Sequence, residues 1–154
     1  MIMIDNDEAI SVLNDLIEVS KDGEQGFLQS SQSVDDPKLK AYFLHRSHEV
    51  KQSVYELQAL VRELGGKPEE SASISGYLHR RWLDIKTAIS SNDNLAVLNE
   101  VERGEDVALR AYRDAANKTL PAAANLLILR QLKGAQRNHD EVKQLRDEAE
   151  LQAH

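Results

Sequence analysis

The sequence predicts an all-α protein built as a four-helix bundle. Apolar residues recur every three or four positions in four long segments, and no segment alternates apolar and polar residues as a half-buried strand does. Residues that commonly begin or end helices stand at the borders of these segments. The four helices would run to roughly 24 to 28 residues, or about 36 to 42 Å at 1.5 Å per residue. Matched lengths of this kind are typical of bundles.

The first helix is expected over residues 5–30. Asp5 and Glu8 have the spacing of a capping box at its start. A helical wheel places Glu18 and Asp22 toward solvent. The residues on the opposite, inward stripe are Ile10, Leu13, Leu16, Ile17, Ser20, Glu24 and Phe27.

The second helix is expected within residues 35–64. Asp36 is suited to be its N-cap, because Pro37 follows in the first helical position, where a missing backbone N–H has no consequence. The helix should end at Gly65, the first of two consecutive glycines. Its inward stripe consists of Leu39, Phe43, Val50, Val54, Leu57 and Val61.

Three further helices complete the pattern. A shorter one is expected over residues 69–89, with Trp82 as the aromatic side chain that anchors it. The last two long helices are expected over residues 94–117 and 121–149. The inward residues of the final helix are Ile128, Leu132, Ala135, His139 and Val142.

The short helix predicts the topology. Few residues separate the first and second long helices, or the third and fourth, so each of these pairs should be antiparallel. A helix of about 20 residues spans roughly 30 Å, which is enough to cross most of the bundle. Such a crossover would leave the second and third long helices parallel, as in the ferritin-like topology with its single long connection. The alternative is a simple array of five helices.

Composition limits the classes of function. A chain of 154 residues suits one domain over residues 1–154, and a formal charge of −7 argues against nucleic acid and anionic membranes as partners. The chain contains no cysteine, which excludes disulfides and thiolate chemistry. The N-terminal "MIMIDNDEAI" has neither a basic segment nor a long apolar run, so we expect a cytoplasmic protein.

Several segments in combination resemble a family of small bacterial ferritin-like four-helix-bundle proteins of unknown function. They are "DGEQGF" in the first helix, "ELQALVRELGG" ending the second, "LHRRW" in the crossover, "VERGED" and "AYRDA" in the third helix, and "QRNHDEVKQLRD" in the fourth. The resemblance extends over nearly the whole chain. It implies the ferritin-like fold but no established reaction.

Two carboxylates stand out in the third helix. Glu105 falls near the centre of its apolar stripe, with Glu102 about 60° to one side at 100° per residue. Buried carboxylates need partners or a proton. Ferritin-like dimetal sites use Glu and Glu-x-x-His ligands, yet the fourth helix has Gln136 three residues before His139, and the second helix offers Glu49 with no His three residues later. A full dimetal centre is therefore not matched.

Two interpretations of these carboxylates remain. In one, a single Fe, Mn or Zn ion is held by a metal site of Glu24, Glu102, Glu105 and His139, whose carboxylate and imidazole groups suit such cations. In the other, which we favour, Arg46 neutralises a carboxylate and the polar layer binds no metal.

The sequence therefore predicts no catalytic residue and no cofactor, because it contains no phosphate loop, nucleotide-binding fingerprint or nucleophile with its base. The expected function is that of a non-catalytic bundle with an interaction or stress-related role, forming a homo-oligomer. The alternative is a metal-binding ferritin-like protein of the oxidase or storage type.

Overall fold

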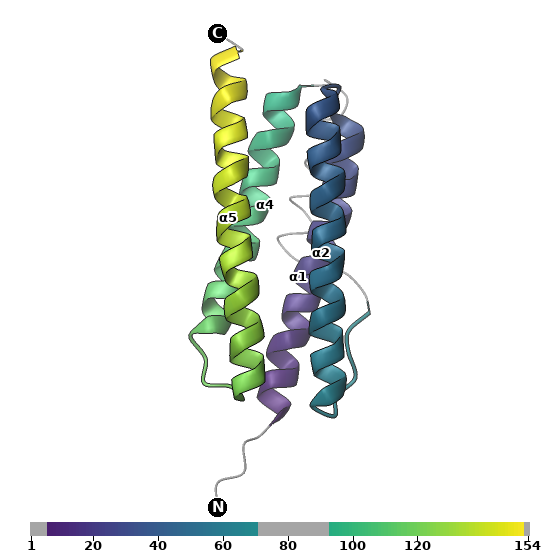
Figure 1. The fold of residues 1–154 in the computed structure, drawn as a ribbon, viewed down its shortest axis with the longest axis vertical. Helices are drawn as coiled ribbons and strands as arrows, with labels where there is room; N and C mark the ends of the chain where they lie inside the picture. Colours follow the sequence, from purple (N-terminus) through teal and green to yellow (C-terminus); the bar gives the residue numbers. More distant parts are fainter. Residues whose placement is uncertain (1–5, 71–92, 153–154) are drawn as a thin grey trace, which may run out of the picture.

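The computed structural model describes residues 6–70 and 93–152, and these residues form four α-helices and no strand (Figure 1). The helices are α1 (Asn6–Ser33), α2 (Pro37–Glu63), α4 (Asn94–Ala116) and α5 (Ala122–Gln152). The prediction of an all-α chain with four long helices is confirmed. The expected crossover helix and its Trp82 lie outside the described residues, apart from the start of that segment.

Local sequence signals set the ends of α2 and α4. The Asp36 side chain accepts a hydrogen bond from the Lys38 backbone N–H at 2.8 Å, which confirms Asp36 as the N-cap of α2. Gly65 follows the end of α2 with a φ of +87°, a conformation that glycine adopts without steric strain. At the start of α4, the Asp93 carboxylate accepts from the next helical N–H groups, those of Leu95 and Ala96.

The helices pack as two neighbouring pairs. In Figure 1, α1 and α5 run upward whereas α2 and α4 run downward. The most extensive helix–helix contacts join α1 to α2 and α4 to α5, while α1 also packs against α4 and α2 lies beside α5. Hydrogen bonds tie α1 to α2 along their length: Ser47 Oγ donates to the Glu24 carbonyl at 2.9 Å.

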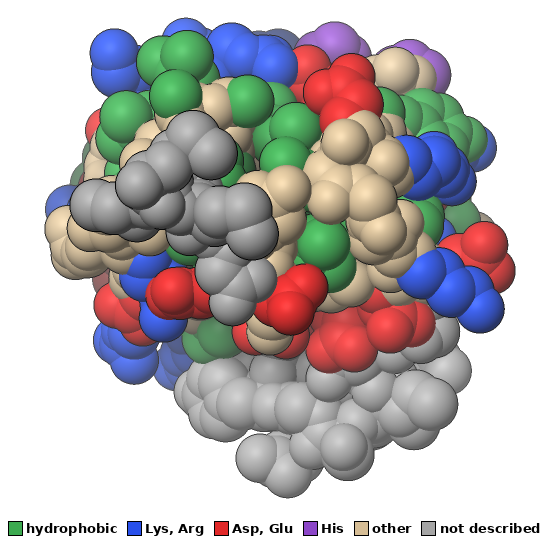
Figure 2. Space-filling model, turned by 90° about the horizontal axis from the view of Figure 1, so that it is seen from below, with side chains coloured by type: hydrophobic (Ala, Val, Ile, Leu, Met, Phe, Trp, Pro, Cys, Tyr) green, Lys and Arg blue, Asp and Glu red, His purple; other side chains and the backbone are tan. Residues whose placement is uncertain are grey.

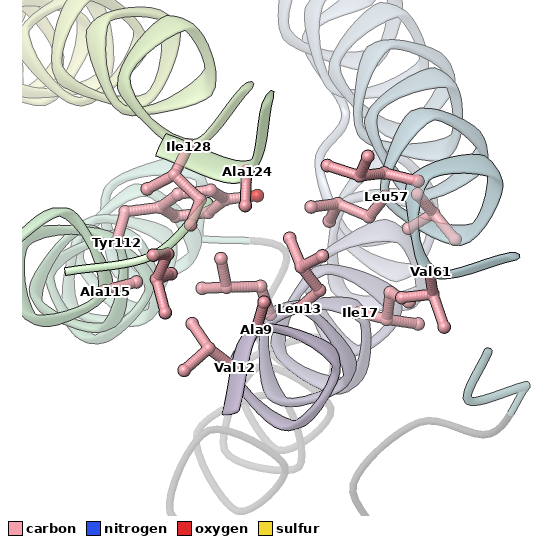
Figure 3. Packing of buried hydrophobic residues seen from close by; sticks show 14 residues of the cluster. Ala9, Val12, Leu13, Ile17, Leu57, Val61, Tyr112, Ala115, Ala124 and Ile128 are labelled. Atoms are coloured by element: carbon pink, nitrogen blue, oxygen red, sulfur yellow. The ribbon is translucent and has the colours of Figure 1, made fainter. Parts of the chain in front are cut away.

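Two hydrophobic clusters fill the two ends of the bundle. The lower cluster, shown in Figure 3, contains Leu13, Ile17, Leu57, Tyr112 and Ile128 among others. The upper cluster is formed by Phe27, Val34, Leu39, Phe43, Val97, Leu98, Val101 and Val142. The apolar stripes of the helices are buried in these two clusters, and the residues between the clusters include polar and charged side chains.

Asp22 of α1 corrects one sequence prediction. The helical wheel placed Asp22 toward solvent, but only 2% of its surface is exposed, so that prediction was wrong. The cause is the position of α1, which packs against both α2 and α4. A helix with two neighbours buries a wider arc than one apolar stripe indicates.

The outer surface of the bundle carries both signs of charge. Figure 2 looks along the bundle from the end at which α1 begins and shows acidic and basic side chains around the rim, with hydrophobic side chains between them. No helix in residues 6–70 and 93–152 combines the length and apolar character required to cross a bilayer.

Candidate functional site

A cavity of about 400 Å³ lies in the middle of the bundle, between the upper and lower hydrophobic clusters. All four described helices contribute to its wall. Exposed residues of α2 and α5, including His48, Gln52 and Arg137, form part of the lining, so the cavity opens to solvent between these two helices. Its volume falls within the range of small-molecule pockets, about 300 to 1,000 Å³. We call it the central cavity.

Small residues leave the central cavity unfilled. The wall includes Gly23 of α1, Gly104 and Ala108 of α4, and Gly134 and Ala135 of α5. A Cβ atom added at Gly134 would find its nearest side-chain neighbour 3.9 Å away, so the space there is open rather than closed by tight helix packing. Small residues from three helices therefore line the same cavity.

A buried ion pair stands in the upper part of the central cavity. Arg46 of α2 and Glu105 of α4 both line it, and their side chains are each 8% exposed. Arg46 Nη2 lies 3.5 Å from Glu105 Oε1, which is longer than an ordinary N–H···O hydrogen bond. Arg46 Nη1 donates to Glu49 at 3.0 Å, and its guanidinium carbon lies 4.9 Å from the centre of the Phe27 ring. The sequence predicted that Arg46 would neutralise Glu105 or Glu102, and the structure shows an ion pair of Arg46 with Glu105.

Burial dominates the electrostatics of Glu105. Desolvation raises the pKa of its carboxyl from 4.5 to about 7, although the charges of Arg46 and His139 act in the opposite direction. Burial and the negative charge of Glu105 together raise the pKa of the nearby Tyr42 hydroxyl far above its usual value. The carboxyl of Glu105 therefore exchanges its proton near neutral pH, which is unusual for a glutamate.

A second polar group, which we call the tyrosine network, closes the lower part of the central cavity. The Tyr112 hydroxyl donates to Gln131 Oε1 at 2.7 Å and lies 3.2 Å from Ser20 Oγ. Gln131 Nε2 in turn donates to the Ser53 carbonyl at 3.2 Å, so the network joins all four described helices. Burial raises the pKa of Tyr112 to about 12, which keeps its hydroxyl a neutral donor.

Replacing Tyr112 with phenylalanine should destabilise the protein by about 1 to 3 kcal/mol, because Gln131 Oε1 would lose its donor in a buried position. Urea unfolding monitored by circular dichroism measures this change. Tyr55 provides the matched control: it is 51% exposed, so Tyr55→Phe should have little effect. Equal stability of the two variants would show that the hydrogen bonds of the tyrosine network contribute nothing to the free energy of unfolding.

The four residues predicted as metal ligands have different surroundings. Glu105 lines the central cavity, whereas Glu102 forms an ion pair with Arg146 of α5. His139 lies on α5 with Nε2 against the Asp106 carboxylate. Glu24 is partly buried on α1, and its backbone carbonyl accepts the hydrogen bond from Ser47. In the parts of the chain before residue 71 and after residue 92, no three His, Asp or Glu side chains converge in a way that could hold a metal ion.

Sequence reasoning missed two members of these polar clusters. Neither the hydrogen bonds of the Tyr112 hydroxyl nor the ion pair of Arg146 with Glu102 was predicted. The buried Gln131 was a usable signal for the tyrosine network, since a buried amide requires partners of its own. Nothing in the sequence pointed to Arg146, because that contact depends on the register of α5 against α4.

The chemistry of the lining residues of the central cavity is mixed. The central cavity combines apolar surface with a few polar groups that orient a ligand, as binding pockets do.

A comparison with known families gives a match over most of the chain. The sequence model of a family described as a domain of unknown function (DUF2383) matches residues 8–118, more than two thirds of the chain. The matched residues include nearly all of α1 and the whole of α2 and α4, three of the helices that line the central cavity. A comparison with curated proteins finds no match.

Proposed function

The chain belongs to the family of this domain of unknown function (DUF2383), and we propose that it is a non-catalytic, ferritin-like bundle that binds a small molecule in the central cavity. The observation that carries the proposal is the cavity itself, about 400 Å³ in size and open between α2 and α5. The cavity is lined by apolar side chains and by a few polar groups, the combination found in small-molecule pockets, and all four described helices contribute to it.

The direction of the helices supports the ferritin-like part of the proposal. Figure 1 shows α2 and α4 running the same way, and residues 64–93 lie between them in the sequence. A single long connection between two parallel helices is the feature that distinguishes ferritin-like bundles from simple up-and-down bundles.

The ion pairs support a non-catalytic role. Glu102 pairs with Arg146, and His139 with Asp106, in each case between α4 and α5. Charged groups held by one another in this way fix the position of helices.

Binding can be tested with a fragment library and amide NMR spectra of the whole chain. Fragments that bind should shift the amide signals of Gly104, Ala108, Gly134 and Ala135, which surround the central cavity. Ala108→Leu, which places a larger side chain in the cavity, should abolish these shifts while the helical circular dichroism persists. The proposal fails if no fragment shifts these signals, or if Ala108→Leu leaves binding unchanged.

The metal-free and metal-binding interpretations predict different metal contents. In the metal-free interpretation, which we favour, arginines pair with Glu105 and Glu102, so purified protein should contain far less than one Fe, Mn or Zn ion per chain. A chelator should then leave the melting temperature unchanged. Elemental analysis and thermal melts with and without chelator measure both quantities. Stoichiometric metal that is lost in Glu105→Gln and His139→Ala would establish the alternative.

A further inference from the structure

Much of the surface of α5 is exposed to solvent. The helix packs mainly against α4 and has a smaller contact with α2. Its buried residues are Ala124, Ile128, Gln131 and Val142, four of 31. The two most exposed large hydrophobic side chains in residues 6–70 and 93–152, Leu126 at 68% and Leu151 at 79%, lie near the two ends of α5. The side of α5 that faces away from the bundle is therefore open to a partner.

A stripe of eight exposed residues follows this outer side of α5. Positions three or four residues apart lie on the same face of a helix. The stripe, which we call the α5 ridge, consists of Leu126, Leu129, Lys133, Arg137, Asp140, Gln144, Glu148 and Leu151. The steps between successive members are 3, 4, 4, 3, 4, 4 and 3 residues, so the spacing is the same when it is read from either end.

Charge is segregated along α5. Residues 122–139 contain three arginines or lysines and no acidic residue, which gives a formal charge of +3. Residues 140–152 contain five acidic and two basic residues, which gives −3. The acidic half includes the C-terminus of the helix, where the helix dipole already carries partial negative charge. A positively charged surface beside this end would stabilise it.

A second copy of α5 supplies that surface when the two helices run antiparallel. Because the spacing of the α5 ridge is symmetric, a two-fold axis between Arg137 and Asp140 places every ridge position opposite another one. The basic half of each helix then faces the acidic half of the other, whereas a parallel pair would bring like charges together. The opposed residues of the two copies are Leu126 with Leu151, Leu129 with Glu148, Lys133 with Gln144, and Arg137 with Asp140.

We propose that the chain forms a two-fold symmetric dimer in which the α5 ridge packs antiparallel against the α5 ridge of a second copy. The leucines provide apolar contacts at both ends of the interface. Lys133 lies between Glu141 and Glu148 of the second copy, because these residues stand three and four positions from the opposed Gln144. The helices meet over about 38 Å, the length of residues 126–151 at 1.5 Å per residue. This inference does not depend on ligand binding in the central cavity.

Charge reversal tests both the dimer and the direction of its helices. Sedimentation velocity of the whole wild-type chain should show a dimer. Lys133→Glu and Glu148→Lys should each raise the dimer dissociation constant at least tenfold, because like charges then face each other at two symmetric places. An equimolar mixture of these two variants should dimerise at least tenfold more tightly than either alone, since opposite charges meet again. Leu126→Glu should also weaken the dimer at least tenfold.

Matched controls come from exposed positions on α2: Lys51→Glu, Glu63→Lys and Leu44→Glu should leave the dissociation constant unchanged. Circular dichroism of each variant checks that the helices persist. A wild-type chain that is monomeric at about 1 mM would overturn the proposal, because even a millimolar dissociation constant gives dimer there. It would also be overturned if the controls weaken the dimer as much as the α5 variants do, or if mixing the charge-reversed variants restores nothing.

Cysteine cross-linking gives a second measurement that does not require charge reversal. The chain has no cysteine of its own, so Leu126→Cys and Leu151→Cys each introduce a single thiol. Under mild oxidation the two variants should form a disulfide with each other when mixed, because these positions are opposed in the antiparallel pair. Cross-links that form as readily within either variant alone would contradict the antiparallel arrangement.

Discussion

Replacing Glu105 with glutamine should stabilise the protein by up to about 3 kcal/mol above pH 7 and have little effect below pH 4.5. Burial raises the pKa of the Glu105 carboxyl from 4.5 to about 7. Between these values the folded state keeps a proton that the unfolded state has lost, so stability falls as pH rises through this window. At about 1.4 kcal/mol per pKa unit the total loss is about 3 kcal/mol. Glutamine has the shape of the protonated form and escapes this loss.

Urea unfolding at several pH values from 4.5 to 8 measures the effect. The wild-type free energy of unfolding should decline across this range relative to Glu105→Gln, and Glu63→Gln should follow the wild type. A Glu105→Gln variant that is less stable than wild type at pH 8 would mean that attraction to Arg46 outweighs desolvation, contrary to the balance inferred here.

Phe43→Ala should destabilise the protein by about 3 to 5 kcal/mol, the usual range for removing a buried phenylalanine. Phe43 is fully buried in the upper hydrophobic cluster, where its ring stacks on Phe27 with 6.3 Å between centroids and meets the Tyr42 ring edge-on at 5.6 Å. Its removal leaves a cavity that helix backbones cannot close. The melting temperature should therefore fall by about 10 °C or more.

Leu44 is the control for this substitution. It follows Phe43 on α2 but is 50% exposed, so Leu44→Ala should change the free energy of unfolding by much less than 1 kcal/mol. Similar losses in the two variants would show that the upper hydrophobic cluster is not the tightly packed end of the bundle that its burial indicates.

The limits of α2 were predictable because the signals are local, whereas α1 and α5 each extend three residues beyond the expected ends at residues 30 and 149. An N-cap such as Asp36 acts on the N–H groups of the next turn, and Gly65 ends α2 through its own backbone conformation. Neither depends on the rest of the fold. The burial of Glu105 was predictable for a related reason, because the residue stands on the apolar stripe of its helix. A buried carboxylate needs a partner, and Arg46 was one candidate.

The register between helices was not predictable. The contacts pair Glu102 with Arg146 and Asp106 with His139, and no local signal in either helix indicates these pairs. The helix α5 has 31 residues and α4 has 23, so their midpoints need not coincide. Side-chain packing across the pair decides the offset, and single-sequence periodicity does not contain it. The central cavity escaped prediction similarly, since it depends on several small residues meeting at one height.

The short links of the bundle have a consequence for how the chain folds. Only residues 34–36 separate α1 from α2, and residues 117–121 separate α4 from α5. Closing such short loops loses little chain entropy, so each helical hairpin can form early from contacts that are close in sequence. Joining the two hairpins brings together helices that are much farther apart in sequence, because residues 64–93 separate α2 from α4. We therefore expect a transition state in which the hairpins are largely formed and the central cavity is assembled last.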